Sequence, residues 1–317
     1  MALELSDDQF INLWMEVRSA AKMAKIIGIG VRTVNKRRAL IQERKSIVLP
    51  SDSPMSPYKA YIPEDKMRIL VEMSDGAFIA FSDAHFWPGI ETTAFRALVQ
   101  LIPEIKPKMI IANGDILDGA RISSHKRIGY EQRPTTRQEL EAVQEALGKI
   151  EGACNGLGTQ LFRTIGNHDI RFDSKLANEM SEYEGIHGMC LDDHLPFWTS
   201  SWSLMINESV MIKHRWHNGI HATYNNALKG GVSIFTGHLH ALGMTRFSDY
   251  NGTRFGVDTG TLADPYGPQF HYMEDNSRNW RSGFAVGTIV DGKLMPPEFC
   301  EVLEEGKVWW RGRQIDV

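Results

Sequence analysis

The sequence predicts an α/β layered domain preceded by a small all-α head. Strand-like apolar runs alternate with amphipathic helical stretches from about residue 67, and a strand-rich tail follows residue 243. Residues 1–50 carry nine Lys/Arg and five Asp/Glu, a net charge of +4, which leaves −8 for the rest of the chain. A basic head on an acidic body indicates two modules, so we expect a head at 1–46, a linker at 47–66 and a main domain at 67–317.

The composition is that of a globular protein without membrane-spanning helices or a disulfide framework. Of the 317 residues, 42% are hydrophobic and 23% charged, close to the globular norm. No run of about 18 apolar residues occurs, so we expect no membrane-spanning helix. The acidic start at residues 1–8 lacks the pattern of a signal peptide. The cysteines are few and far apart (Cys154, Cys190 and Cys300), which favours a reducing cytoplasm and no disulfide framework.

The head reads as three helices. Phe10, Leu13, Trp14 and Val17 recur at helical spacing behind Ser6, a candidate N-cap. A short helix at 19–28, a turn at 29–33 and a basic helix at 34–45 follow, and the arrangement resembles a helix-turn-helix. We therefore predict a DNA-binding head; the alternative is a solvated basic helix without a nucleic-acid partner. The residues expected to contact DNA are Arg32, Lys36, Arg37 and Arg38.

The elements of the main domain follow a linker that contains four prolines and several serines between residues 46 and 66. Short apolar runs predict strands, and longer amphipathic stretches predict helices. The expected strands lie at 78–81, 109–112, 160–165, 210–213 and 232–235, and the expected helices at 92–105 and 137–154.

Five of these expected strands run directly into carboxylate, amide or imidazole side chains. In open α/β sheets, sites form outside the carboxyl ends of the strands, so one clustered polar site explains all five. Each motif alone is weak, but five in order, each behind an apolar run, are hard to obtain by chance. The motifs are Asp83-Ala-His85, Gly114-Asp-Ile-Leu-Asp118, Gly166-Asn-His-Asp169, His214 and Gly237-His-Leu-His240.

Carboxylate, imidazole and amide donors without cysteine favour hard-to-borderline divalent metals such as Mn²⁺, Fe or Zn²⁺. In Asp83-Ala-His85, alternate residues of an extended chain point to the same side, so both can reach one metal. His238 and His240 have the same spacing. The glycines at 114, 166 and 237 let the backbone approach a ligand without a Cβ clash.

Together these motifs resemble the calcineurin-like metallophosphoesterase superfamily, over roughly residues 77–300. The resemblance implies a four-layer α/β/β/α sandwich and two divalent metal ions, expected to be Mn²⁺, with Fe, Zn²⁺ or Mg²⁺ as alternatives. One metal would take Asp83, His85, Asp115 and His240, and the other Asp115, Asn167, His214 and His238. Asp115 would bridge the two.

The resemblance also implies how the site works. A metal-bound hydroxide would attack phosphorus, and His168 would protonate the leaving oxygen, with Asp169 orienting its imidazole. Asp118 would hold a ligand histidine rather than bind a metal. The fourth-strand ligand could be His214 or His217; His214 directly follows the apolar run and is the expected one.

The head favours DNA among the phosphoesters that the superfamily hydrolyses. A DNA-binding head would raise the local DNA concentration near a body that otherwise repels a polyanion. The leading hypothesis is therefore a DNA phosphodiesterase or nuclease. The alternatives are a phosphatase or a cyclic-nucleotide or nucleotide phosphodiesterase whose head docks on a partner, and a non-enzymatic binding protein. Gly119 and Asp169 depart from the protein-phosphatase pattern, and the compact layout resembles phage-encoded members.

Three further residues near the motifs have open roles. Arg171 and Arg121 could contact substrate phosphate, although a lone loop arginine is more often solvated or salt-bridged. Trp87, two residues after His85, is a candidate platform for base stacking, whereas the other tryptophans read as packing residues.

Overall fold

The computed structural model of the protein describes residues 5–17, 20–45, 47, 49, 58–61 and 67–317. The chain divides into two compact units, Met1–Tyr58 and Lys59–Val317, and each is described by itself. Most of the expected linker at 47–66 lies outside the described residues, so its conformation stays a prediction.

The head consists of three helices: α1 (Asp7–Val17), α2 (Ala20–Ile27) and α3 (Val31–Lys45). Ser6 begins α1 as expected, because its hydroxyl accepts the Gln9 N–H at 3.3 Å and Gln9 Oε1 accepts the Ser6 N–H at 2.8 Å. A small apolar core is shared by the three helices, with fully buried side chains at Phe10, Trp14, Met23, Ile27, Val34 and Ile41.

The turn between α2 and α3 is shorter than expected. It spans Gly28 to Gly30, and α3 begins at Val31 rather than at residue 34. Gly28 adopts a positive φ of 72°, a left-handed conformation that ends α2 without a Cβ penalty. A three-residue, glycine-containing turn between two helices is the connection that helix-turn-helix motifs use.

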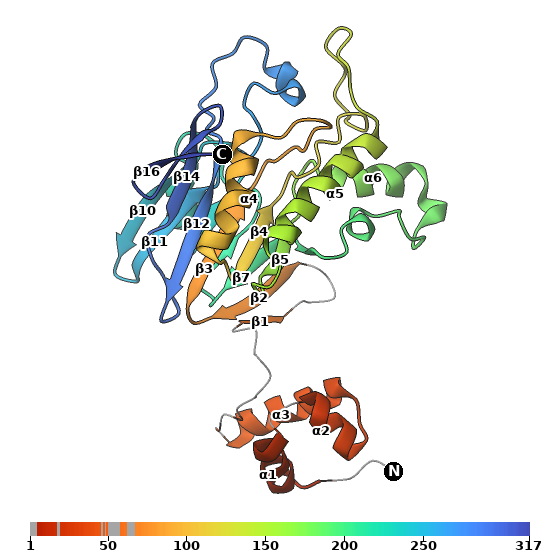
Figure 1. The fold of residues 1–317 in the computed structure, drawn as a ribbon, viewed down its shortest axis with the longest axis vertical. Helices are drawn as coiled ribbons and strands as arrows, with labels where there is room; N and C mark the ends of the chain where they lie inside the picture. The colour runs from red at the N-terminus through yellow and green to blue at the C-terminus, as the bar shows by residue number, and fades with distance from the viewer. Residues whose placement is uncertain (1–4, 18–19, 46, 48, 50–57, 62–66) are drawn as a thin grey trace. The chain divides into compact units, whose positions relative to one another are not determined.

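The larger unit contains two β-sheets (Figure 1). The seven-stranded sheet has the order β1 (Tyr58–Tyr61), β2 (Arg68–Met73), β7 (Ser203–Ile206), β8 (Val210–Ile212), β9 (Ser233–Thr236), β11 (Gly252–Asp258) and β10 (Gly243–Asp249). The nine-stranded sheet runs β16 (Arg313–Asp316), β15 (Lys307–Trp310), β14 (Glu298–Glu304), β12 (Gly283–Val290), β3 (Gly76–Phe81), β4 (Met109–Asn113), β5 (Gln160–Thr164) and β6 (Thr199–Ser201), with β13 (Lys293–Leu294) paired to β12.

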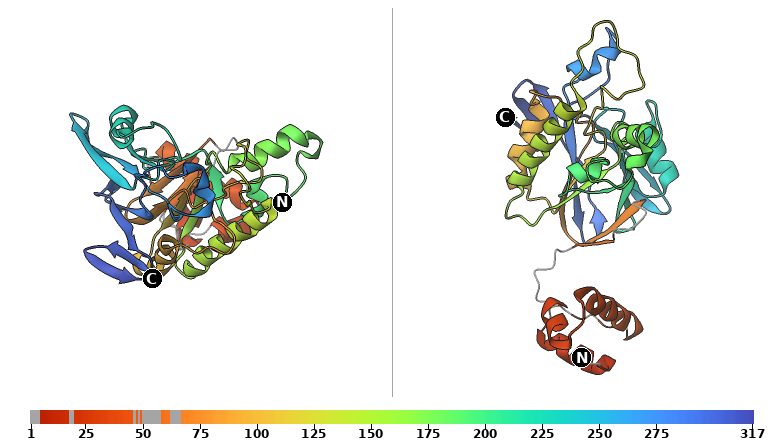
Figure 2. Two further views of the ribbon diagram at one scale, coloured as in Figure 1. Left: turned by 90° about the horizontal axis from the view of Figure 1, so that it is seen from above. Right: turned by 90° about the vertical axis from the view of Figure 1, so that its right-hand side faces the viewer.

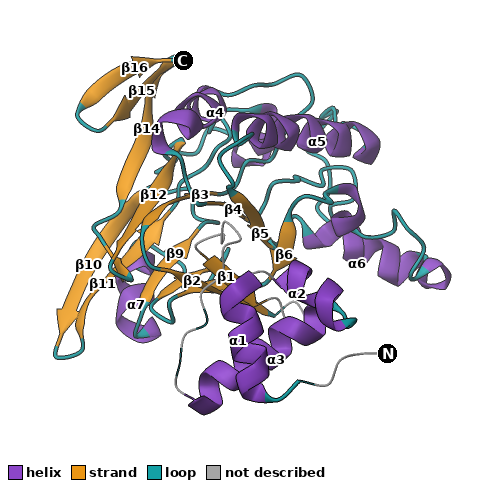
Figure 3. Ribbon diagram, turned by 60° about the horizontal axis from the view of Figure 1, so that its bottom comes forward, coloured by secondary structure: helices purple, strands orange, loops and turns teal. Residues whose placement is uncertain are grey.

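The two sheets pack face to face and helices cover their outer faces. Phe78 of β3 meets Phe235 of β9 edge to face, with ring centroids 5.3 Å apart. Helices α4 (Thr93–Ile105) and α5 (Thr136–Ala153) cover the nine-stranded sheet, and α7 (Ala222–Gly230) packs on β9, β10 and β11 (Figure 3). The view from the side separates these layers (Figure 2). The expected four-layer α/β/β/α sandwich is confirmed.

The outer helices form where their sequences place N-caps and apolar faces. Thr92 caps α4 by accepting the Phe95 N–H, and Thr135 and Gln138 form a capping box at the start of α5. The apolar face of α5 buries Val143, Leu147 and Ile150 against the sheet. The remaining helical segments are α6 (Ile170–Glu179) and the short 3₁₀ turns η1 (Ser181–Tyr183), η2 (Leu191–His194) and η3 (Pro268–Met273).

Among the described residues, no helix is both long and apolar enough to cross a membrane.

Candidate metal centre

Three adjacent parallel strands of the nine-stranded sheet end at the same edge, and the first three polar motifs follow them. Strands β3, β4 and β5 pair in parallel, so their carboxyl ends lie together. The segments beyond them stay side by side, because the Asp83 N–H donates to the Gly114 carbonyl and the His85 N–H to the Asp115 carbonyl, both at 3.0 Å. The motifs after β3 and β4 are thereby held together beyond the sheet itself.

The seven-stranded sheet delivers the other motifs to the same place. Strands β8 and β9 pair in parallel and lead into His214 and into Gly237–His240. Two contacts tie these ends to the first sheet: His214 Nδ1 donates to the Asn113 carbonyl at 2.8 Å, and the His238 N–H donates to Asp83 Oδ2 at 2.8 Å. Residues about 150 positions apart in the sequence therefore form one site.

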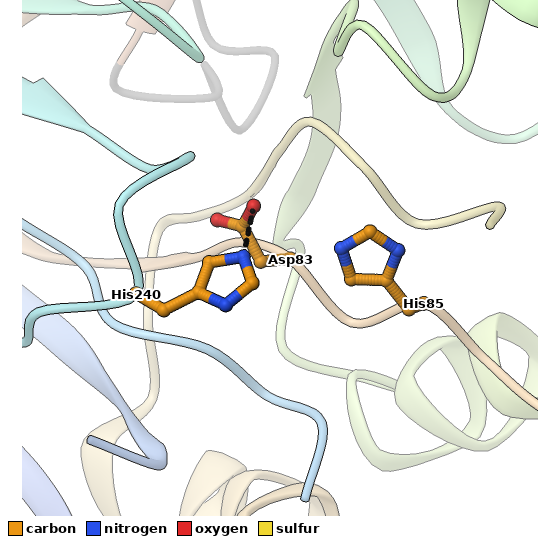
Figure 4. Close-up of side chains that lie close together, drawn as sticks. All are labelled: Asp83, His85 and His240. Atoms are coloured by element: carbon orange, nitrogen blue, oxygen red, sulfur yellow. Dashed lines mark hydrogen bonds and ion pairs between the residues drawn. The ribbon is translucent and has the colours of Figure 1, made fainter. Parts of the chain in front are cut away.

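Asp83, His85 and His240 form a first group of potential ligands (Figure 4). All three are buried, and His240 Nε2 lies 3.0 Å from Asp83 Oδ1. Asp118 Oδ1 lies 3.0 Å from His85 Nδ1, the contact expected of a carboxylate that holds a ligand histidine. This contact directs the other ring nitrogen of His85, Nε2, toward the site.

A second group contains Asp115, His214 and His238. His214 Nε2 lies 3.0 Å from Asp115 Oδ2, and its Nδ1 is fixed by the Asn113 carbonyl. The other oxygen of Asp115, Oδ1, accepts the His168 N–H at 2.7 Å. The structure thus places His214 rather than His217 beside Asp115; the His217 ring instead lies against Trp216, with centroids 4.7 Å apart and the ring planes tilted by 34°.

Two potential ligand atoms of these motifs are buried without a hydrogen bond among the described residues: His240 Nδ1 and Asn167 Oδ1. Buried polar atoms of this kind normally find a partner, and an unpartnered donor set marks a missing one. Two carboxylates, imidazoles and an amide oxygen are the ligand types that Mn²⁺, Fe and Zn²⁺ accept. The residues present therefore fit two divalent cations, one for each group.

The electrostatics of the site also favour cations. Burial alone would raise the pKa of Asp83, but the charges of His240 and His214 lower it to about 2. Burial would likewise lower the pKa of His214, yet Asp115 and Asp83 outweigh it and raise that pKa to about 10. Two buried carboxylates thus hold positive charge strongly, and the same field attracts a divalent ion.

Five of the seven expected ligands have a left-handed backbone, which corrects the expectation of an extended chain. The φ angles are 51° at Asp83, 39° at His85, 52° at Asp115, 72° at His238 and 57° at His240. Positive φ is uncommon outside glycine and costs of order 1–3 kcal/mol per residue. Such strain clusters at functional sites, so the turns themselves, not strand alternation, aim these side chains inward.

Two motif glycines allow the close approach that brings the ligands together. A Cβ on Gly166 would lie 2.1 Å from Asp115 Oδ1, and one on Gly237 would lie 2.6 Å from Asp83 Oδ2. Neither contact is possible for a real side chain, so both positions require glycine for steric reasons. The expected close backbone approach at residues 166 and 237 is therefore present.

His168 lies beside both groups, but its partners differ from the expected ones. Its Nδ1 lies 2.8 Å from the Asp118 carbonyl and 3.2 Å from Asp118 Oδ1, and its Nε2 lies 3.1 Å from Arg171 Nη2. Burial lowers the pKa of His168, but the hydrogen bond to Asp118 and the charges of Asp115 and Asp118 raise it overall. Arg171, whose role the sequence leaves open, lies in the first turn of α6 rather than in a loop and is therefore part of the site.

Asp169 does not orient the His168 imidazole, and that expectation is wrong. Its buried carboxylate accepts four backbone N–H groups at 3.0–3.2 Å, those of Asp115, Ile116, Leu117 and Gly166. Asp169 therefore holds the loop after β4 against the loop after β5, and it shapes the site through the backbone. The sequence motif identifies the residue but not the atoms it binds.

The four head residues expected to contact DNA differ in their surroundings. Lys36 is exposed on α3. Arg37 donates to the Leu5 carbonyl and its guanidinium lies 5.2 Å from the Phe10 ring centroid, whereas Arg38 donates to the Leu49 carbonyl and lies 4.5 Å from the Trp14 ring centroid. These two arginines stabilise the head itself, and the side chain of Arg32 lies outside the described residues.

Two aromatic residues beside the expected ligands belong to none of the sequence motifs. Phe270 of η3 lies edge-on to His85, with centroids 5.2 Å apart, and Trp280 lies 4.4 Å from the His240 ring. Both belong to the loop after β11, which has no regular pattern that predicts it. A polar run after a strand, Asp258-Thr-Gly-Thr261, is the available signal, since Thr261 Oγ1 donates to the Asp83 carbonyl at 2.7 Å.

The arrangement has the parts of a phosphoester-hydrolysing centre. Asp83, His85 and His240 would hold one divalent cation and Asp115, His214 and His238 a second, and such ions would neutralise phosphate oxygens and activate water. His168 Nε2 lies 4.0 Å from Asp115 Oδ2 and accepts from Arg171 Nη2, so it can hold a proton for a leaving oxygen once the guanidinium turns away from it. Arg171, which donates to the Asp118 carbonyl at 2.9 Å, adds a fixed positive charge beside it.

Comparisons with known proteins agree with this geometry. The chain matches the model of the calcineurin-like phosphoesterases over residues 76–255. None of the curated proteins matches it in sequence. Among solved structures it is similar to Vps29 of Entamoeba histolytica with Zn²⁺ (14% identity, 76% of this chain and 98% of that chain, TM-score 0.39). An archaeal phosphodiesterase (12%, 71% and 99%, 0.36) and the E. coli phosphoesterase Yfce (14%, 70% and 97%, 0.33) are also similar.

These structural scores are low and add no argument about the substrate. The family match is different, because it covers more than half of the 317 residues and contains all seven expected ligands, from Asp83 to His240. Members of the family use two divalent metals, in agreement with the two groups of ligands described above. The chain therefore belongs to the calcineurin-like phosphoesterase family and is a metal-dependent phosphoester hydrolase.

Proposed function

We propose that this phosphoesterase is a phosphodiesterase that hydrolyses DNA and that its head binds the DNA. The observation that carries the proposal is the three-residue turn joining α2 to α3, followed by a helix whose exposed residues include Thr33, Asn35 and Lys36. In helix-turn-helix proteins the N-terminal part of the second helix contacts base edges in the major groove. A polar and basic face at this position of α3 is suited to that contact.

The charge distribution supports the same proposal. The head carries +4 and the rest of the chain −8. Two of the cationic side chains are occupied within the head, because Arg44 pairs with Asp7 at 3.2 Å and Lys45 with Asp8 at 2.5 Å; the net charge of +4 already includes these acidic partners. Of the four expected DNA contacts, Lys36 is exposed and is retained, and Arg32, whose side chain is not described, stays a prediction. Phosphate contacts from few cations predict moderate affinity.

We propose Mn²⁺ as the metal and His168 as the residue that protonates the leaving oxygen. The expected ligands for one cation are Asp83, His85, Asp115 and His240, and for the other Asp115, Asn167, His214 and His238. Mixed carboxylate and imidazole donors support Mn²⁺, and Fe or Zn²⁺ would also suit them.

The test uses the full-length protein with Mn²⁺ and three substrates: linear DNA, bis(p-nitrophenyl) phosphate and p-nitrophenyl phosphate. The proposal expects hydrolysis of DNA and of the diester, with the monoester slow. Activity confined to the monoester would overturn it in favour of a phosphatase. Asp115→Asn, purified identically, is the control for a contaminating nuclease, since it removes the carboxylate shared by both proposed sites.

A further inference from the structure

We infer that the pocket beside His168 binds an unpaired nucleoside attached to the phosphate in the metal centre. This inference rests on the proposed function, which it refines by naming the form of the substrate. The pocket has a volume of about 530 Å³ and is lined by Asn167 and His168 of the site. Ligand pockets of 300–1,000 Å³ hold small molecules of nucleotide size.

Two long loops form the pocket walls. The loop 119–135 between β4 and α5 and the segment around η3 project at the same end of the unit, and both views of this end place them side by side (Figures 1 and 2). Residues from both loops line the one pocket. Because His168 lines the pocket and also lies beside Asp115 and His85, a group seated in the pocket would be close to a phosphate held by the proposed cations.

The aromatic residues of the pocket fit a base. Trp87 and Tyr272 both line it, and Tyr272 is 52% exposed although it stands next to a buried site. Bases stack on such rings without sequence preference, because every base has a π-face. A phosphomonoester without a ring system would leave both aromatic side chains unused.

The polar and charged residues of the pocket are suited to the edge of a base and to a phosphate group. Gln269 lines the pocket and is only 6% exposed, yet its Oε1 has no hydrogen bond among the described residues. A carboxamide offers both an acceptor and donors, so it can pair with the edge of a base. Of the cationic residues that line the pocket, Arg133 pairs with Glu131 at 3.0 Å, whereas Lys126 and Arg171 add positive charge that favours a phosphate group.

A base enters such a pocket only when it is not paired and stacked in a duplex. Single strands, frayed ends and small nucleotides meet this condition, whereas an intact duplex must first unstack the base at a cost. The pocket therefore favours a single-stranded or unpaired substrate at the metal centre, whatever the head binds. A free nucleotide offers the same chemistry, so the test separates the two sources.

The first arm measures binding of two ligands to the Mn²⁺-loaded full-length protein by calorimetry. Deoxyadenosine 5′-monophosphate and 2-deoxyribose 5-phosphate differ only by the base. The expected Kd for the nucleotide is roughly 5- to 150-fold lower, the range that one stacked base contributes. Equal Kd values for the two ligands would overturn the inference, and they would do so without any assumption about DNA hydrolysis.

Substitutions in the pocket test whether it causes the difference in Kd between the two ligands. Tyr272→Ala should lower the ratio of the two Kd values at least 5-fold, and Tyr272→Phe should retain it because the ring remains. Tyr250→Ala is the matched control, since Tyr250 is fully exposed in the turn between β10 and β11 and should leave the ratio unchanged. A ratio that is the same in Tyr272→Ala and the wild type would overturn the assignment to this pocket.

The second arm compares hydrolysis of a single-stranded oligonucleotide with that of the same sequence closed into a hairpin duplex. Faster hydrolysis of the single strand supports a polynucleotide source. Base-dependent binding of the nucleotide without hydrolysis of either DNA supports the pocket and overturns the DNA proposal in favour of small nucleotides. Equal rates on the two DNA forms would overturn the requirement for an unpaired base.

Discussion

His168 is held in place by two residues that are not among the proposed metal ligands, so its role can be tested separately from metal binding. Asp118 contacts its Nδ1 and Arg171 its Nε2. We predict that His168→Ala keeps both metals and lowers kcat for a diester about 10²- to 10⁴-fold, the range for loss of a general acid or base. Metal analysis beside the rate measurement checks this. His187→Ala, at a side chain 86% exposed, is the control.

Asp169→Asn provides the contrast to this variant. Its carboxylate accepts four N–H groups from two loops, and an amide loses one acceptor oxygen and directs an NH₂ group at N–H donors. Metal content and thermal stability should therefore fall together. A variant of normal stability and metal content that has lost only its rate would return Asp169 to the role of orienting His168.

At the scale of residues, the sequence motifs identify which side chains form the site, because ligand chemistry restricts residue types at fixed spacing. They do not reveal how the backbone presents them. The positive φ angles at Asp83, His85 and Asp115 arise from contacts between two loops, such as the hydrogen bond from the Asp83 N–H to the Gly114 carbonyl. Tyr272 and Gln269 have no motif at all, since only the tertiary fold brings them beside His168.

The loops after β4 and β5 pack so closely at Gly166 that adding a single methyl group there should force them apart. Gly166→Ala would place a Cβ 2.1 Å from Asp115 Oδ1, and because Gly166 has no positive φ the effect is purely steric. We predict loss of most bound metal and activity. Gly148→Ala, in the interior of α5 with no atom within 4 Å of its Cβ, is the matched control. That substitution should leave metal content unchanged and stabilise the helix by about 0.5–1 kcal/mol.

Helix α5 is attached to the loop after β4 by a buried carboxyl group. Glu139 accepts the Ala120 N–H at 3.0 Å, and burial raises its pKa to about 7. The folded protein therefore retains a proton that the unfolded chain loses near pH 4.5. This contribution to stability is complete below pH 4.5, declines as pH rises to about 7, and amounts to about 3 kcal/mol at most.

We predict that Glu139→Gln removes this pH dependence, because the amide stays neutral and can still accept the Ala120 N–H. Urea unfolding at pH 5 and pH 8, with a chelator present, should show a smaller loss of stability in the variant than in the wild type; the part that remains includes Asp258, whose pKa burial also raises to about 7. Glu141→Gln, on the exposed side of the same helix, serves as control. Identical differences between the two pH values in the wild type and Glu139→Gln would contradict the raised pKa.

At the scale of elements, strands and helices with a regular hydrophobic pattern can be predicted from the sequence, whereas those without one cannot. The strands at β3, β4 and β5 and the helices α4 and α5 have continuous apolar runs or clear amphipathic faces, and each lies within a few residues of its expected place. Strand β2 alternates in burial but not in sequence, because the apolar Leu70 occupies an exposed position, and α7 is a short helix with weak periodicity. Neither has a pattern strong enough to predict without its neighbours.

At the scale of the whole molecule, the two units differ in the sign of their net charge. A chain of net charge −4 conceals a head of +4, which has its own apolar core and its own cap. Because the head buries its own hydrophobic residues, it should be removable without unfolding the larger unit. The sequence predicts this division from charge and proline content, whereas the use of Arg37 and Arg38 within the head becomes visible only in the structure.

Deletion of residues 1–50 should therefore separate DNA binding from chemistry. We predict that the shortened protein hydrolyses bis(p-nitrophenyl) phosphate with an unchanged kcat/KM, while its affinity for DNA falls and depends less on salt. Each phosphate contact that is lost reduces the slope of log K against log salt by about 0.9 for duplex DNA, so the slope counts the contacts made by the head. Lys36→Ala in the full chain should remove about one such unit, and Lys175→Ala, in the larger unit where Lys175 pairs with Glu179, should remove none. An unchanged slope after the deletion would show that the head binds something other than DNA, and the larger unit would then bind its substrate alone.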